Sequence, residues 1–137
     1  MGEVRIKVRI INAADQVMAR RGQMELSAVR FYDADAMVDT GAVSTVLPFE
    51  VVNALGLSTP RQRGVEYADG RNEVVPVTEA IVIEIGNRAT SDEAVVLGDE
   101  VLIGQTILEK LDLHVDCANH VVVPNPAHPD QAITKVK

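Results

Sequence analysis

The sequence predicts a mainly β protein whose short strands form a closed or semi-closed barrel, with one or two short helices. Short runs of β-branched residues alternate between apolar and polar positions along much of the chain, which is the period of a half-buried strand. Asp-Gly and Gly-Asn pairs separate several of these runs, as hairpin turns do. The segments with helical spacing are few and short, which disfavours a sheet of alternating strands and helices.

The strands expected before the first helix follow from this alternation. Residues 4–11 place apolar and basic side chains on opposite faces of one strand. Residues 12–23 are largely polar and contain a glycine, so we expect a loop. A second alternating strand is expected over 24–32, a turn over 33–35, and a short buried strand over 36–39.

The two helices are predicted from their ends and their apolar faces. A short strand over 45–47 precedes Pro48, and Gly56 follows residues 49–55; proline at the start and glycine just past the end are typical of a helix. Residues 105–111 form the second helix, because their apolar positions fall on one side.

A long hairpin is the clearest local signal in the chain. Residues 63–68 and 71–85 are both rich in strand-forming residues, and Asp69-Gly70 stands between them, which is typical of a primed hairpin turn. A further turn at 86–87 leads into an expected strand over 89–97.

The last third of the chain is predicted to contain short strands and a tail. A break over 98–100 precedes a short apolar strand, 101–103. Two strands, 113–117 and 120–123, form the final pair. Residues 125–137 contain few periodic apolar positions, so we expect one domain over residues 1–124 followed by a C-terminal tail.

Composition excludes several classes of partner. The 137 residues include 47% hydrophobic and 3% aromatic side chains, so the core must consist of aliphatic residues. A net charge of −7 argues against nucleic acid, which binds clustered cations. No apolar run is long enough to span a bilayer, so we expect no membrane partner. The single cysteine, Cys117, rules out an intrachain disulfide and favours a reducing, cytoplasmic location.

Two short motifs carry the functional hypothesis. Asp39-Thr40-Gly41-Ala42 follows an apolar run and precedes a second β-branched run. Taken alone, the tripeptide fits an ordinary turn after a strand equally well, since Asp and Gly favour turns. The later segment Leu102-Ile103-Gly104, followed by a helix, makes the chemical interpretation stronger.

The order of these motifs resembles the retroviral-type, single-lobe aspartic peptidases, the retropepsin-like families, and especially their small prokaryotic members. The carboxylate motif, a short helix, a long hairpin and an apolar-apolar-Gly segment with a helix occur in the same order, over roughly residues 4–124. The resemblance implies a retropepsin-like acid protease β-barrel with a flap hairpin. It also implies hydrolysis of peptide bonds in peptide or protein substrates, without cofactor or metal.

The resemblance assigns a role to each matching residue. Asp39 would be the catalytic carboxylate, one from each subunit of a homodimer. Thr40 would form a hydrogen bond across the two-fold axis, and Gly41 would allow close approach of the substrate backbone. The implied substrate-binding positions are Ala42, the flap residues Tyr67, Ala68, Asp69 and Gly70, and the pair Ile103 and Gly104, which would pack behind the catalytic loop.

The chain departs from the retroviral pattern at two positions. Retroviral enzymes usually carry an acidic residue where Val43 stands and a basic residue where Gln105 stands, and these groups pair at the dimer interface. An ionic part of the interface is therefore missing. This departure favours the alternative function, a binding or scaffold module with the same fold and little or no catalysis.

Other chemistry has weaker support in the sequence. His114 and Asp116 share a strand face, but without a matching cluster they are more typical of a solvated edge than of a metal site. Ser44 lacks the second glycine of a nucleophile elbow, and Cys117 is expected to be a small half-buried hydrophobe. An ordinary strand-surface position is the alternative for Tyr67. A β-barrel of another family with a chance Asp-Thr-Gly is the third possibility.

Overall fold

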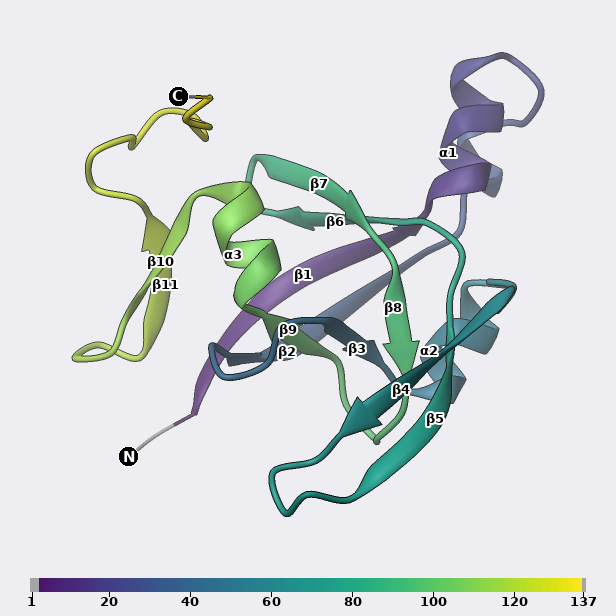
Figure 1. Ribbon diagram of the computed structural model, residues 1–137. Helices are drawn as coiled ribbons and strands as arrows, with labels where there is room; N and C mark the ends of the chain where they lie inside the picture. The colour runs from purple at the N-terminus through teal and green to yellow at the C-terminus, as the bar shows by residue number, and fades with distance from the viewer. Residues whose placement is uncertain (1–2, 137) are drawn as a thin grey trace.

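The computed structural model describes residues 3–136 (Figure 1). Residues 1 and 2 of the predicted domain, and residue 137 of the predicted tail, lie outside the described residues. Within the described range, every helix falls short of the length and apolar character that a membrane crossing needs. The strands are β1 (Val4–Asn12), β2 (Phe31–Asp39), β3 (Thr45–Leu47), β4 (Arg61–Glu66), β5 (Asn72–Val77), β6 (Ile81–Ile85), β7 (Arg88–Asp92), β8 (Ala94–Val96), β9 (Leu102–Gly104), β10 (Leu113–Asp116) and β11 (Val121–Pro124). The helices are α1 (Ala13–Arg20), the 3-10 helix η1 (Leu26–Ala28), α2 (Phe49–Ala54) and α3 (Gln105–Leu111).

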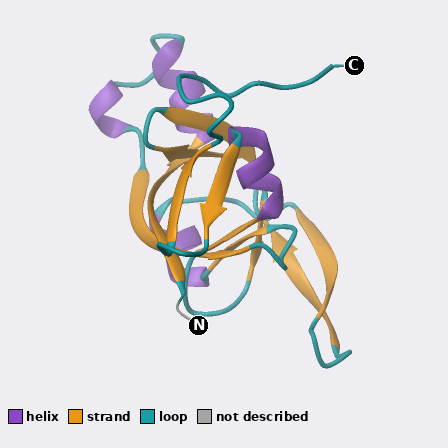
Figure 2. Ribbon diagram, turned by 90° about the vertical axis from the view of Figure 1, so that its left-hand side faces the viewer, coloured by secondary structure: helices purple, strands orange, loops and turns teal. Residues whose placement is uncertain are grey.

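One large curled sheet forms the body of the protein. Nine of the described strands pair in the order β4-β5-β8-β3-β9-β2-β1-β6-β7, and β10 and β11 form a separate pair. Figure 2 shows the strands of the large sheet curving around an enclosed interior. The mainly β architecture with few short helices confirms the predicted fold class.

Aliphatic side chains fill the interior of the curled sheet. Ile10, Ile83 and Ile103 come from three different strands, and their exposed fractions are 0%. The helices α2 and α3 add their buried faces to the same cluster, among them Val52 and Ile107. Burial of each such side chain stabilises the fold by roughly 1.5–3 kcal/mol, so the aliphatic core compensates for the scarcity of aromatic residues.

The loop predicted over residues 12–23 is wrong, because most of it forms α1. The Asn12 side chain accepts a hydrogen bond of 3.1 Å from the backbone N–H of Asp15 and caps the helix. Asp15 is buried and pairs with Arg30, whose guanidinium Nε lies 2.8 Å from its Oδ2. Among the polar residues that suggested a loop, Asn12 is therefore a helix cap and Asp15 is the buried member of an ion pair with the half-exposed Arg30. With α1, the described residues contain three α-helices, one more than expected.

The turn predicted over residues 33–35 is also wrong, because β2 runs without interruption through it. Most of the strand predicted over 24–32 is instead the 3-10 helix η1 and irregular chain. β2 pairs antiparallel with β1, which places Asp33 opposite Arg9 and Asp35 opposite Lys7. The Arg9 Nε lies 2.8 Å from the Asp33 carboxylate. Cross-strand charge pairing explains why acidic residues that favour turns lie inside this strand.

Two strands predicted as continuous are interrupted. The range 71–85 divides into β5 and β6, because β5 pairs with β4 and β8, whereas β6 pairs with β1 and β7. The range 89–97 divides into β7 and β8 for the same reason, since β8 pairs with β3 and β5. In both cases the interruption lies where the chain changes its pairing partners in the curled sheet.

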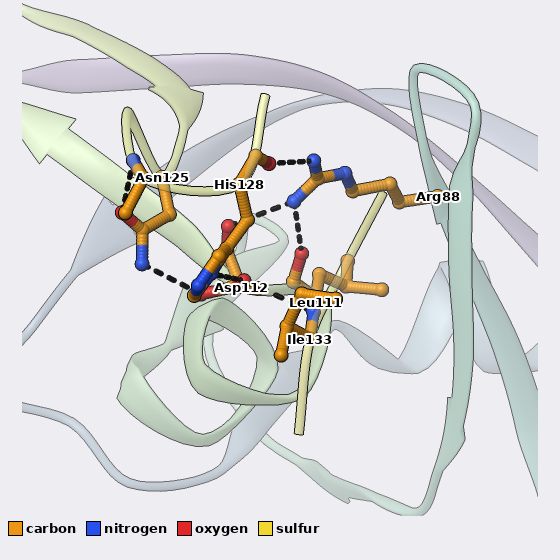
Figure 3. A network of polar contacts seen from close by, with 7 residues as sticks. Arg88, Leu111, Asp112, Asn125, His128 and Ile133 are labelled. Atoms are coloured by element: carbon orange, nitrogen blue, oxygen red, sulfur yellow. Dashed lines mark hydrogen bonds and ion pairs between the residues drawn. The ribbon is translucent and has the colours of Figure 1, made fainter. Parts of the chain in front are cut away.

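The C-terminal segment is held by a polar network around Asp112 (Figure 3). Its carboxylate accepts hydrogen bonds from Asn125 Nδ2 at 2.9 Å, His128 Nδ1 at 2.6 Å and the backbone N–H of Ile133 at 3.1 Å. The buried Arg88 donates to the carbonyl oxygens of Asp112 and His128, both at 2.8 Å. The hydrogen bonds from Asn125 and Ile133, followed by that from His128, lower the pKa of Asp112 to about 2.

Candidate active site

Asp39 is the last residue of β2 and lies where the strand turns into a tight loop. The backbone N–H of Gly41 donates a 2.9 Å hydrogen bond to Asp39 Oδ1, and the N–H of Ala42 donates to the Asp39 carbonyl at 3.1 Å. A Cβ at Gly41 would lie 3.2 Å from the same carboxylate oxygen. The loop therefore orients the carboxylate through backbone groups, at a position that is half-buried.

Gly104 lies directly behind this loop. β9 runs parallel to β2, and Gly104 is the register partner of Asp39. A Cβ at Gly104 would lie 2.7 Å from the carbonyl oxygen of Ala42 and 2.8 Å from that of Val43. The N–H of Gln105 donates to the Ala42 carbonyl at 2.8 Å. Only a residue without a side chain fits here, so this contact fixes the loop from behind.

A cavity of about 650 Å³ lies between the Asp39 loop and the hairpin β4–β5. It brings together five of the sequence-predicted site residues: Asp39, Gly41, Ala42, Tyr67 and Ala68. The other five do not line it. Thr40 is exposed, Ile103 and Gly104 are buried behind the loop, and Asp69 and Gly70 lie at the exposed end of the hairpin.

Sequence reasoning missed the apolar and basic residues of the cavity wall. Val46, Val65, Val95 and Leu97 line it and pack in one cluster with the buried face of β5. Arg63 lines it from β4. Alternation along residues 63–67 puts Arg63, Val65 and Tyr67 on one strand face, but no sequence signal shows that this face lies opposite Asp39.

The turn of the hairpin differs from the primed turn that Asp69-Gly70 suggested. The N–H of Gly70 donates to the Tyr67 carbonyl at 2.9 Å, and the N–H of Tyr67 donates to the Arg71 carbonyl at 2.8 Å. Gly70 has a φ of 87°, and no positive φ occurs at Asp69. This is the three-residue connection in which a left-handed glycine follows a type I turn.

Side chains near the β4–β5 turn contact one another through a hydrogen bond, a cation-π contact and an ion pair. The Tyr67 hydroxyl donates to the Glu73 carboxylate, and the Arg71 guanidinium lies 4.8 Å from the centre of the Tyr67 ring. Arg71 also pairs with Asp69 at 2.7 Å. The hydrogen bond to Glu73 raises the pKa of Tyr67, so its ring stays neutral at physiological pH.

The histidine and aspartate of β10 have separate surroundings. Asp116 accepts hydrogen bonds from the backbone N–H groups of Ala118 and Asn119 and from the Asn119 side chain at 2.8 Å, so it caps the β10–β11 turn. His114 is exposed. Within residues 3–136, no group of three or more His, Cys, Asp or Glu side chains has the geometry to hold a metal ion.

Solved structures with the same arrangement of strands show which fold this is. The chain is similar to the EIAV protease in complex with the inhibitor HBY-793, with a TM-score of 0.52, 18% identity, and coverage of 80% of this chain and 88% of that one. It is similar to the retroviral protease-like domain of Ddi1 from Leishmania major (TM-score 0.56, 12% identity, coverage 92% and 90%). It is also similar to a retropepsin-like aspartic protease from Rickettsia conorii (TM-score 0.54, 17% identity, coverage 84% and 77%). The fold is that of a retropepsin-like aspartic protease.

The sequence itself identifies the family. The family described as "gag-polyprotein putative aspartyl protease" matches residues 29–110, more than half of the 137-residue chain. The chain belongs to this family, which confirms the resemblance seen in the sequence. The match includes both Asp39 and Gly104. A comparison with curated proteins gave no match.

Proposed function

We propose that the protein is an aspartic endopeptidase whose active site forms between two copies of the chain, each contributing one Asp39. The observation that carries the proposal is the position of the Asp39 carboxylate, held by the Gly41 N–H at the edge of a cavity of about 650 Å³ beneath a hairpin. The cavity is open and much of its wall is formed by valine and leucine side chains, which suits an extended peptide.

The chemistry needs two carboxylates. Two such groups about 3 Å apart cannot both ionise, so they share one proton. The ionised carboxylate removes a proton from a water molecule, whose oxygen attacks the carbonyl carbon of the peptide bond. The other carboxylate gives its proton to the carbonyl oxygen, and a tetrahedral diol forms. The first carboxyl group then gives the proton that it took from water to the nitrogen, the C–N bond breaks and the amine leaves. A hydroxyl of the diol returns its proton to the second carboxylate as the carboxylic acid product forms. In a symmetric pair, either Asp39 can begin as the acid.

Three features of the single chain support a second copy as the partner. Asp-Thr-Gly occurs once in the sequence, so one chain supplies one carboxylate. Thr40, beside Asp39, is exposed in the single chain and is free to form a hydrogen bond across a two-fold axis. Val43 is 71% exposed although it is apolar, and a second copy packed against this loop would cover it.

The direct test compares the wild-type protein with Asp39→Asn, which keeps the shape of the side chain and removes its charge. Both proteins are incubated with a diverse peptide library from acidic to mildly basic pH, and cleavage is read by mass spectrometry. We expect cuts by the wild type that are absent with the variant. Sedimentation velocity at the assay concentration establishes that both proteins are dimeric.

A binding or scaffold module with this fold is the second candidate. Val43 and Gln105 carry no charge, so they cannot form the ion pair of the retroviral interface, and the Gln105 side chain instead lies 3.4 Å from Glu109. Peptide binding without cleavage by a protein shown to be dimeric would favour this candidate over the peptidase.

Two further parts of the proposal concern location and extent. Cys117 is exposed and is the single cysteine of the chain, which suits a reducing compartment such as the cytoplasm. We assign residues 1–124 to the protease domain and 125–137 to the C-terminal tail. No cofactor, nucleic acid or membrane has a role in the proposed reaction.

A further inference from the structure

The inner face of the hairpin β4–β5 carries one arginine whose charge has no partner. Register pairs Arg63 with the buried Val75, so their side chains share one face of the hairpin, and Arg63 is among the residues that line the cavity. Two other arginines of this hairpin are neutralised. Arg61 forms an ion pair with Glu93, and Arg71 pairs with Asp69. Among the described residues, no carboxylate forms an ion pair with Arg63.

We propose that Arg63 is a specificity-determining residue that selects substrates with an acidic side chain near the cleaved bond; this inference rests on the proposed peptidase function. A guanidinium presents a planar set of donors that matches a carboxylate in two parallel hydrogen bonds. Arg63 lines the same cavity as Asp39. A peptide lying in that cavity would bring its side chains within reach of this unpaired cation.

The position of the acidic residue follows from the length of the hairpin strand. Arg63 precedes Tyr67, at the start of the turn, by four residues, which is about 13 Å along an extended chain. An extended substrate rises by about the same distance per residue. With the turn of the hairpin placed over the cleaved bond, the acidic side chain belongs about three or four residues from that bond. In a two-fold dimer the second Arg63 lies on the other side, so the preference applies to both sides of the bond.

Asp39 and Glu66 are the carboxylates that line the cavity, and neither outweighs this contact. The shared proton leaves one negative charge on the Asp39 pair, but three or four residues along the substrate are about 10–13 Å, which exceeds the screening length of about 8 Å at physiological ionic strength. Glu66 also borders the cavity, yet strand alternation places it on the face of β4 opposite to Arg63. The net charge of −7 disfavours acidic substrates in general, so selection must come from a local contact such as Arg63.

The test uses matched peptides that contain a cut site found with the library and either Glu or Gln three or four residues from the cut. For the wild type we expect kcat/KM to be about three- to tenfold higher for the Glu peptide. Arg63→Glu should reverse the preference and favour a Lys peptide over the Gln peptide. Arg21→Glu, which makes the same charge change at an exposed position of the α1 end, should keep the preference for Glu.

The outcomes separate this inference from the proposed function. Cleavage that depends on Asp39 but is equal for Glu and Gln peptides overturns the role of Arg63 and leaves the peptidase intact. If no cleavage depends on Asp39, the same fluorescently labelled peptides are titrated against Asp39→Asn and Asp39→Asn/Arg63→Glu by anisotropy. Tighter binding of the Glu peptide that is lost in the double variant supports selection by Arg63, whereas equal binding, or none, overturns it.

Discussion

Gly104 is a residue whose small size, and not its backbone conformation, is required by its surroundings. It lies in extended backbone, so its conformation does not require glycine, and the reason for glycine is the space. The carbonyl groups of Ala42 and Val43 occupy the place of a Cβ. The sequence alone suggested a tight contact at this position but not which atoms make it.

Gly104→Ala should therefore destabilise the protein by about 1–3 kcal/mol, because the backbone of the Asp39 loop must move to accept one methyl group. The free energy of unfolding is measured by urea denaturation. Gly64→Ala is the control, since Gly64 is also in a strand and no atom lies within 4 Å of its added Cβ. Equal stability of the two variants would contradict the packing role of Gly104.

Ala42 belongs to the same loop and bears on pH dependence. Its side chain has no hydroxyl that donates a hydrogen bond to an ionised carboxylate. Ala42→Ser adds such a donor, so we expect the acid limb of the pH–kcat/KM profile to move to lower pH. Ala42→Gly, which adds no donor, should leave that limb in place. An unchanged profile for the serine variant would show that the residue at this position does not set the pH range.

Among the elements, those with a clear local signal were predicted best. Pro48 and Gly56 bounded α2 to within a residue, and the alternation of β1 was found correctly because one of its faces is apolar and the other is basic. The predicted turn that divides β2 is wrong, because Asp33 pairs with Arg9 of β1 and the residues near Asp33 in the sequence do not indicate this pairing. Asn12 before α1 is a sequence signal for the start of a helix, because its side chain caps the backbone.

The C-terminal segment is an element defined by its side-chain contacts. Loss of the imidazole in His128→Ala should weaken the contacts around Asp112, and we expect faster hydrogen exchange at the Ile133 amide, which donates to the same carboxylate. His114→Ala is the matched control, because His114 is exposed and lies on β10. Unchanged exchange in His128→Ala would mean that Asn125 and Ile133 hold the segment by themselves.

The same network predicts a pH response of known sign. The folded pKa of Asp112 is about 2, below its ordinary value of 3.8. A carboxylate whose pKa is lowered on folding contributes stability above the ordinary value and loses it as pH falls through the lowered value. In the wild type, protection of the Ile133 amide should therefore hold above about pH 4 and be lost toward pH 2. This protection is measured by hydrogen exchange, with each rate divided by the intrinsic exchange rate at the same pH.

For the whole molecule, the main prediction is that the active site is shared. If each site needs two Asp39 carboxylates, an equal mixture of wild-type and Asp39→Asn chains, after exchange of subunits, forms wild-type pairs in about one quarter of its dimers. Activity should fall to about that fraction of an all-wild-type sample at the same total concentration. A fall to only one half would mean that each chain works alone.

The candidate site as a whole was predictable only in part. The residues that touch Asp39 through local backbone bonds follow it directly in sequence, so the motif located them. The walls of the cavity come from β3, β4 and the β8 region, and the curl of the sheet brings them together. No sequence pattern around Arg63 or Leu97 indicates that these residues line the cavity, because the cavity depends on tertiary structure.

The pairing of Asp39 with Gly104 determines when, during synthesis, the catalytic loop gains its support. During translation the ribosome adds Asp39 well before Gly104, so the strand that supports the Asp39 loop is complete only after residue 104 has been added. A truncated or nascent polypeptide that ends before this residue contains the carboxylate without the backing that fixes it. Under the proposed function, proteolytic capacity thus arises only after residue 104 has been added, and chains that end before it cannot digest one another.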